Sequence, residues 1–167
     1  LAIQDLTYES NQPFVSGDNN ILVFNGEIFN WKEILKLIPN DLLEKNINSD
    51  TKFLSFLLNN DLIEKYIHKF KGFFSFVYFC PSKFYVSCGR DCFGVKPLYY
   101  AYEDNKYPIF SSTSEAITVN PAISNNLNPE SLGSYLRFGF FPDIKSPFLG
   151  INQLTPGTYV KLYLNKD

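Results

Sequence analysis

Hydrophobic positions early in the chain follow helical spacing after one short apolar run. Residues 21–24 are continuously apolar, which is the pattern of a buried strand, and the run stops at Asn25-Gly26. Asn30 then predicts the start of a helix, because its side chain can cap the first turn. A second helix is predicted from Asp50. Four apolar residues share one face of it: Phe53, Leu54, Leu57 and Leu58.

The pattern changes to that of strands after residue 72. Residues 73–80 are apolar on both faces, which predicts a central strand, and residues 84–88 form its antiparallel neighbour. Further strands are predicted at 98–102, 109–112 and 158–164, and a helix begins at Asn128-Pro129 and ends near Gly139. Helices grouped early and antiparallel hairpins afterwards predict an α+β fold with stacked sheets, not alternating βαβ units.

Composition narrows the class of protein. The length of 167 residues fits one domain, and the aromatic content of 17% indicates sheet faces packed with rings. The net charge is −2 with both signs interspersed, and no apolar run reaches membrane-spanning length, so we expect neither nucleic acid nor membrane as a partner. The three cysteines, Cys80, Cys88 and Cys92, do not fit a secreted disulfide framework and predict a cytoplasmic location.

The start of the chain predicts a fragment. The sequence contains no methionine and begins at Leu1, and residues 1–6 read as a strand already in progress. We therefore expect that upstream residues have been lost. Their loss would leave a sheet edge and apolar surface exposed, which predicts poor solubility of this piece.

Two short polar segments are candidates for chemistry. Asn25-Gly26-Glu27 fits a two-residue hairpin turn, for which Asn-Gly is a strong signal. It also fits a strand that ends in a sharp turn, where an amide side chain and a backbone N–H stabilise a developing oxyanion. Ser49-Asp50-Thr51 fits a helix cap, and its carboxylate can also bind a ligand ammonium. The residues alone leave both pairs of alternatives open.

Eight segments give these candidates a context. In order they are residues 1–6 with 11–13 (LAIQDL and NQP), 23–30 (VFNGEIFN), 49–51 (SDT), 72–76 (GFFSF), 90–100 (RDCFGVKPLYY), 110–115 (FSSTSE), 138–142 (FGFFP) and 150–157 (GINQLTPG). Together they resemble the class II glutamine amidotransferase domain of glutamine-hydrolysing asparagine synthetases, over nearly the whole chain. The last two resemble the stretch that joins that domain to the ATP-using synthetase domain.

The resemblance implies a fold and a reaction. The fold is the αββα sandwich of N-terminal-nucleophile hydrolases, with two mainly antiparallel sheets and an incomplete N-terminus. Residues 1–126 would belong to the amidotransferase domain, and residues 127–167 to its end and to the connection toward a synthetase domain. In relatives an N-terminal cysteine thiol attacks the glutamine amide, with its own α-amino group as base. The ammonia then serves the ATP- and Mg²⁺-dependent amidation of aspartate in the second domain, and the amidotransferase domain itself needs no cofactor or metal.

The resemblance also assigns roles to residues. Asn25 and Gly26 would form the oxyanion hole, Glu27 and Asp50 would bind the α-ammonium of glutamine, and the backbone of Leu1 and Ile3 would line the pocket. The nucleophile would lie upstream of Leu1, so we expect residues 1–167 alone to be inactive.

Other polar residues are assigned no catalytic role. None of the three cysteines has an α-amino base, and with one histidine their spacing matches no zinc pattern. His68 is expected to be a structural or surface residue. Arg90 and Asp91 are expected to brace the glycine-containing loop that follows them.

Two alternatives remain open for the parent protein. It amidates another acceptor, a sugar or a peptide, or it lacks the nucleophilic cysteine and serves as a non-catalytic scaffold. Glutamine and the synthetase domain are the expected partners, and a homodimer of the full-length protein is a further expectation.

Overall fold

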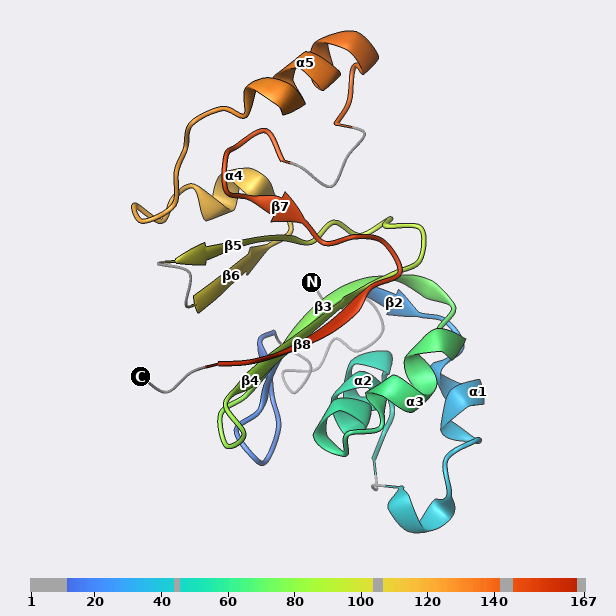
Figure 1. Ribbon diagram of the computed structural model, residues 1–167. Helices are drawn as coiled ribbons and strands as arrows, with labels where there is room; N and C mark the ends of the chain where they lie inside the picture. Colours follow the sequence, from blue (N-terminus) through green and yellow to red (C-terminus); the bar gives the residue numbers. More distant parts are fainter. Residues whose placement is uncertain (1–11, 44–45, 104–106, 142–145, 165–167) are drawn as a thin grey trace.

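Two antiparallel sheets lie face to face in this computed structural model, with helices on their outer sides (Figure 1). The structure describes residues 12–43, 46–103, 107–141 and 146–164. Leu1 and Ile3, which were expected to line a substrate pocket, lie outside the described residues. The two-sheet arrangement confirms the α+β prediction.

The larger sheet carries the predicted central strand. Its five strands lie in the order β1 (Phe14–Val15), β2 (Ile21–Ile28), β3 (Gly72–Cys80), β4 (Tyr85–Arg90) and β8 (Tyr159–Tyr163). All neighbouring pairs are antiparallel, and Phe24 lies opposite Phe76 in the β2–β3 pair. Aromatic residues at successive positions of β3 favour this strand because they pack on both faces of a sheet.

Three helices cover the outer face of the larger sheet. They are α1 (Trp31–Leu35), α2 (Asp50–Asn59) and α3 (Ile63–Tyr66), accompanied by 3-10 turns at Asn40–Leu42 and Ile67–Lys69. Leu22 and Ile28 from β2 and Phe53, Leu54 and Leu57 from α2 are fully buried in one core. The predicted start of α2 is confirmed, because Ser49 Oγ accepts a hydrogen bond from Lys52 N over 3.2 Å.

The smaller sheet lies on the other side of the larger one. Its order is β6 (Tyr107–Ser111), β5 (Tyr99–Glu103) and β7 (Asn152–Gln153), and α4 (Ser114–Ile117) packs on it. The last helix, α5 (Pro129–Phe138), stands clear of both sheets (Figure 1). It begins and ends as the sequence predicts, with a capping asparagine, Asn128, and a left-handed Gly139 after its last residue.

Both predicted geometries of Asn25-Gly26 were wrong. The strand neither turns back nor ends there, because β2 continues to Ile28 and pairs with β3 along its whole length. Gly26 has φ = 123°, and a Cβ at this position would overlap the carbonyl oxygen of Phe73 on β3. The glycine therefore permits a positive φ within the strand and a close approach of β3, instead of a turn.

The predicted side-chain cap of Asn30 was also wrong. Asn30 stands at the N-terminus of α1, but its side chain makes no capping hydrogen bond. It donates to Lys69 O over 2.9 Å and accepts from Lys71 N over 2.8 Å instead. These bonds tie the end of β2 to the start of β3, an arrangement that local sequence does not reveal.

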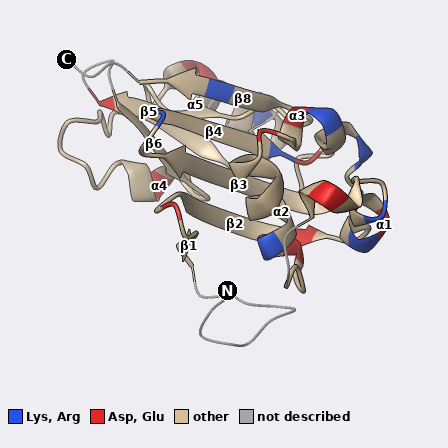
Figure 2. Cartoon of the chain, turned by 90° about the horizontal axis from the view of Figure 1, so that it is seen from below, with Lys and Arg blue, Asp and Glu red and all other residues tan. Residues whose placement is uncertain are grey.

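Charged residues of both signs are interspersed along the chain, and many lie on or near α1, α2 and α3 (Figure 2). Within the described ranges, no helix combines the length and apolar character needed to cross a bilayer.

Candidate functional site

The edge of β2 presents a row of backbone N–H groups. Phe24 N donates to Gln12 Oε1 over 2.6 Å, while Gln12 Nε2 donates back to Phe24 O over 2.5 Å. Ile28 N, four residues on, donates to Asp50 Oδ2 over 3.1 Å. In an antiparallel strand, alternate residues direct their N–H and C=O groups to the same side. Gly26 lies between Phe24 and Ile28, so its N–H faces this same edge, away from β3.

The hydrogen bonds of β3 support this direction of the Gly26 N–H. Phe74 lies opposite Gly26. Its carbonyl oxygen accepts a hydrogen bond from Asp91 N over 2.8 Å, and its N–H donates to Asp91 Oδ2 over 3.2 Å. Both of its backbone groups therefore point toward β4. The pair Gly26–Phe74 is a position where the β2–β3 ladder makes no hydrogen bond.

Asp50 is a buried carboxylate at the first turn of α2. It is 4% exposed, and besides Ile28 N it accepts from Thr51 N over 2.9 Å. Burial raises the pKa of the Asp50 carboxyl above its usual value, and these two N–H bonds oppose that effect. The negative charge of Glu27 raises this pKa further, which places the two carboxylates within electrostatic reach of each other. Two neighbouring carboxylates, one of them buried, favour a cationic ligand.

Asn25 lines a cavity of about 580 Å³ beside this edge. Its other polar wall residues include Gln12, Ser75 and Ser111, and its apolar ones include Leu98 and Phe110. Glu27 and Asp50 are not part of this wall. Asn25 and Glu27 stand on either side of Gly26 on β2.

The loop after β4 is held by the two residues predicted to brace it. Arg90 donates to Lys96 O, Leu154 O and Gly94 O over 2.6–2.8 Å. Asp91, which is 1% exposed, accepts from Phe93 N, Val95 N and Lys96 N over 3.0–3.1 Å. Each side chain bonds to backbone groups, and in this way the loop brings Pro97 and Leu98 to the cavity wall.

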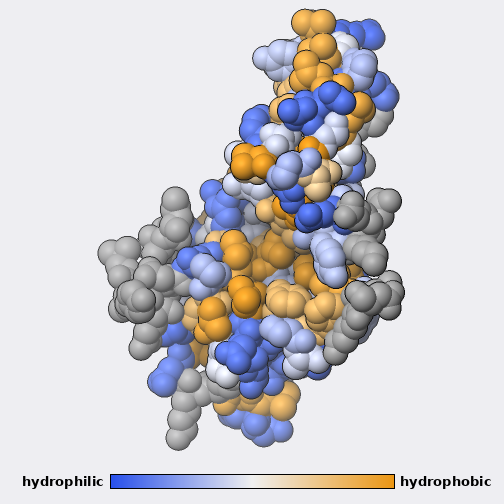
Figure 3. Space-filling view, turned by 90° about the vertical axis from the view of Figure 1, so that its left-hand side faces the viewer, coloured by the Kyte–Doolittle hydropathy of each residue, from blue (hydrophilic) through white to orange (hydrophobic). Residues whose placement is uncertain are grey.

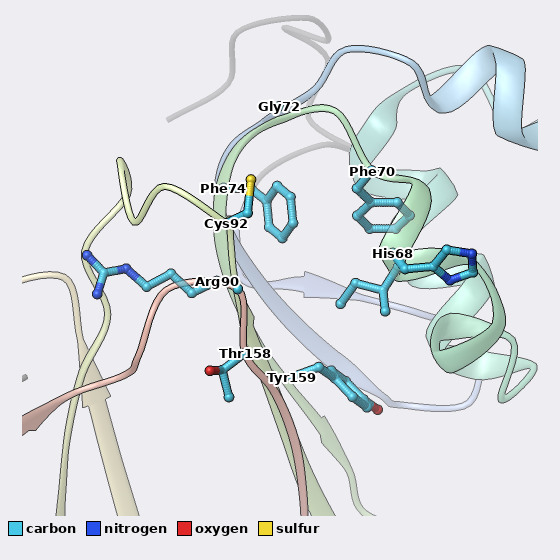
Figure 4. Close-up of a pocket in the computed structure, with 10 residues that line it drawn as sticks. His68, Phe70, Gly72, Phe74, Arg90, Cys92, Thr158 and Tyr159 are labelled. Atoms are coloured by element: carbon cyan, nitrogen blue, oxygen red, sulfur yellow. The ribbon is translucent and has the colours of Figure 1, made fainter.

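A second, smaller cavity of about 240 Å³ lies where β4, β8 and the turn after α3 meet (Figure 4). Cys92, Phe74 and His68 are among its lining residues, but the imidazole of His68 points away from Cys92. His68 is exposed, as predicted. Burial raises the pKa of the Cys88 thiol to about 11, so this thiol is protonated near neutral pH and a poor nucleophile. No group of metal-binding side chains is present among the residues that the structure describes.

The structure thus brings four of the six predicted site residues to one stretch of β2 and the adjoining end of α2: Asn25, Gly26, Glu27 and Asp50. Sequence reasoning gave no role to Gln12, which closes the edge of β2 at Phe24. Its presence in the NQP segment was the only signal. The sequence also gave no indication that Asp91 bonds to Phe74 on β3.

Known proteins supply an independent comparison. The family model described as "Glutamine amidotransferase domain" matches residues 1–167. A Methanocaldococcus jannaschii protein provisionally named asparagine synthetase [glutamine-hydrolyzing] 2 is 31% identical over 159 residues, which cover 85% of this chain and 30% of that protein. Asparagine synthetase [glutamine-hydrolyzing] 2 of Bacillus subtilis is 29% identical and matches all of this chain but only 22% of its own length.

A solved structure supports the fold. Glutamine phosphoribosylpyrophosphate amidotransferase from B. subtilis superposes with a TM-score of 0.61 at 20% identity, over 94% of this chain and 30% of that one. The predicted sandwich of two mainly antiparallel sheets is therefore confirmed as the fold class. The chain spans less than a third of the length of each of these proteins.

Proposed function

The chain belongs to the glutamine amidotransferase domain family, and we propose that it is the glutaminase part of a glutamine-hydrolysing asparagine synthetase. In this proposal the domain hydrolyses glutamine to glutamate and ammonia. A second domain of the parent protein, with ATP and Mg²⁺, uses the ammonia to amidate aspartate. The glutaminase step needs no cofactor. The proposal also places the protein in the cytoplasm, as the sequence predicts.

The proposal rests above all on the row of N–H groups along β2. The outer two N–H groups, of Phe24 and Ile28, bond to side chains of this chain, and Gly26 N–H faces the same edge between them. Together with the amide of Asn25, this N–H supplies two donors for the oxygen of a tetrahedral intermediate. The attacking thiol comes from outside residues 1–167, because the chain's own cysteines lack an α-amino base.

The two carboxylates complete the substrate site. Glu27 and Asp50 together provide negative charge at the end of β2 that follows Gly26, which suits the α-ammonium of glutamine. The buried carboxylate of Asp50 would compensate the ammonium group for the loss of its water shell. The bound cation would in turn lower the raised pKa of Asp50. The spacing along β2 then separates the ammonium end of the ligand from its reacting amide.

Glutamate release by the full-length protein tests this assignment. Asn25→Ala should lower kcat by about 10²–10³ if its amide stabilises the oxyanion. Asn126→Ala is the matched control, because this exposed asparagine lies in a loop far along the chain. Equal rates for wild type and Asn25→Ala would remove Asn25 from the oxyanion hole. Residues 1–167 alone should release no glutamate.

The same assay separates the remaining alternatives. A parent protein that releases no glutamate, but makes its amide from free ammonia, would be a synthetase with a scaffold domain in place of a glutaminase. A parent protein that releases glutamate, but does not amidate aspartate, would retain the glutaminase function and use another acceptor.

A further inference from the structure

The side chain of Gln12 takes the place of a neighbouring strand at one point of β2. Strand β1 pairs with β2 through Phe14, which lies opposite Leu22, and the same antiparallel register, continued by two residues, places Gln12 opposite Phe24. The Oε1 of Gln12 accepts from Phe24 N over 2.6 Å, and its Nε2 donates to Phe24 O over 2.5 Å. A side-chain amide carries the same donor and acceptor as a peptide group, so it can replace the bonds of a ladder.

These bonds hold the peptide group that precedes Asn25. The carbonyl of Phe24 and the N–H of Asn25 belong to one planar unit, so a bond that fixes the Phe24 oxygen also fixes the plane from which Asn25 continues. The cavity that Gln12 and Asn25 share has a mainly apolar wall. Hydrophobic residues also gather at the middle of the face of the body that Figure 3 shows. In apolar surroundings an unmade hydrogen bond is costly, so the Gln12 amide holds this peptide firmly.

The backbone around Gly26 depends on anchors outside the β2–β3 ladder. Gly26 stands at a position where that ladder makes no hydrogen bond, and a glycine by itself permits many backbone conformations. Beyond Gly26, Asp50 Oδ2 holds Ile28 N over 3.1 Å. The two proposed oxyanion donors, the Asn25 amide and the Gly26 N–H, therefore lie between two side-chain anchors, with Gln12 before them and Asp50 after them.

We propose that Gln12 is a positioning residue of the oxyanion hole, an inference that rests on the proposed function. Gln12 acts through the peptide between Phe24 and Asn25, which sets the directions of the Asn25 amide and of the Gly26 N–H. An oxyanion donor is effective when it is aimed in advance at the place where charge develops, because no reorganisation is then needed during the reaction. Gln12 therefore contributes to turnover and not to the ground-state binding of glutamine.

Gln12→Met in the full-length protein tests this role, because methionine has nearly the length of glutamine and forms neither hydrogen bond. The kcat for glutamate release, per folded molecule as counted by circular dichroism, should fall by about 10- to 100-fold, since a misplacement of about 1 Å can cost about 100-fold. KM for glutamine should stay nearly unchanged, because Glu27 and Asp50 act at the end of β2 that follows Gly26. Gln153→Met is the matched control. This half-buried glutamine lies on β7 in the smaller sheet, and its loss should leave kcat unchanged.

Gln12→Glu adds a readout that a loss of stability alone would not give. The introduced carboxylate can still accept from Phe24 N, but it meets Phe24 O with a lone pair where the glutamine donates. Once protonated, it can donate to Phe24 O and restore both bonds. The kcat of this variant relative to the wild type should therefore be low at neutral pH and rise as the pH falls through the pKa of the introduced carboxyl, which burial raises above about 4.3. The described residues that line the cavity carry no charge, and titrations elsewhere affect both proteins alike. A ratio that does not change with pH would contradict the proposal.

A double-mutant cycle shows whether Gln12 acts through Asn25. In an Asn25→Ala background, Gln12→Met should lower kcat by a smaller factor than in the wild type, because one of the donors that it misplaces is already absent. Losses that multiply fully would contradict this coupling.

The outcomes separate the positioning role from the proposed function. An active wild type with an unchanged kcat in Gln12→Met would overturn the positioning role and leave the glutaminase function in place. A raised KM with an unchanged kcat would make Gln12 a ligand-binding residue and equally overturn it. A full-length wild type that releases no glutamate would contradict the proposed function itself, and the positioning role with it.

Discussion

Helices α2 and α5 are equally long and begin in the same way, yet they play opposite parts in the molecule. Each has ten residues and a side chain that caps its first turn, Ser49 for α2 and Asn128 for α5. In α2 the residues Phe53, Leu54 and Leu57 are fully buried, whereas α5 buries only Ser131. A cap therefore fixes the residue at which a helix begins, whereas the burial of its apolar face depends on the surface that packs against it.

The two helices also differ in chemistry. The first residue of α2, Asp50, reaches the edge of β2 and accepts a hydrogen bond from Ile28 N. Helix α5 carries its charged residues near its ends and presents an uncharged stripe. The buried helix thus supplies a polar group to the candidate site, and the exposed helix presents apolar side chains at the surface.

Truncation of a buried leucine in α2 should have the largest effect on stability. Leu57→Ala removes a side chain that is 0% exposed and leaves a cavity in the main core, so the free energy of unfolding should fall by about 2–5 kcal/mol. Denaturant unfolding of the domain measures this. A loss below about 0.5 kcal/mol would show that α2 is no more tightly packed than α5.

Removal of the charge at Asp50 should weaken glutamine binding. Asp50→Asn keeps an acceptor for Ile28 N but loses the charge, so KM for glutamine should rise by roughly 10- to 100-fold, the range for a charged hydrogen bond. Steady-state glutamate release of the full-length protein measures it. An unchanged KM would exclude Asp50 from the ligand site.

The pH dependence of KM sharpens this assignment. The ligand ammonium stays charged at mildly acidic pH, while Asp50 takes up a proton as the pH falls through its raised pKa. The neutral acid does not attract the ammonium, so KM in the wild type should increase as the pH falls through that value. In Asp50→Asn this increase should be absent or smaller, and an identical pH profile would contradict the role of Asp50.

Loss of either cap should cost about 1 kcal/mol of helix stability, but the cost should be felt in different places. Ser49→Ala should lower the free energy of unfolding of the domain, because α2 unfolds together with the core. Asn128→Ala should speed amide exchange within α5 and leave the global unfolding unchanged. Global destabilisation of the same size by both variants would show that α5 belongs to the same cooperative unit as α2.

The smallest effect is expected for the exposed stripe of α5 in residues 1–167 alone. Leu136→Ala should change the free energy of unfolding by no more than about 0.5 kcal/mol there, because the side chain is 78% exposed. A large loss in the short chain would mean that Leu136 packs within it.

Several local features could be predicted because their causes are local. Asn128-Pro129 and Gly139 bound α5, and Ser49 caps α2, since a helix terminus is satisfied by residues a few positions away. The run from residue 73 to 80 became β3 because aromatic residues pack on both faces of a sheet. The loop-bracing role of Arg90 and Asp91 was also confirmed.

Features that depend on a neighbouring strand could not be predicted. Asn25-Gly26 carries the local signal of a turn, but β3 pairs across it and carries the strand on to Ile28. Asn30 carries the signal of a cap, but Lys69 and Lys71 take its hydrogen bonds from 39 and 41 residues away. In both cases long-range pairing outweighed a local preference worth about 1 kcal/mol.

The sequence by itself determined the class of fold, the start of α2, both ends of α5 and the residue types of the candidate site. Only the tertiary structure decided that Gly26 N–H faces away from β3, and that Asp50 bonds to Ile28 N of β2. The physical reason is that side-chain periodicity and caps act within a few residues, whereas the direction of an N–H group depends on which strand lies next to it. The register between β2 and β3 fixes that direction.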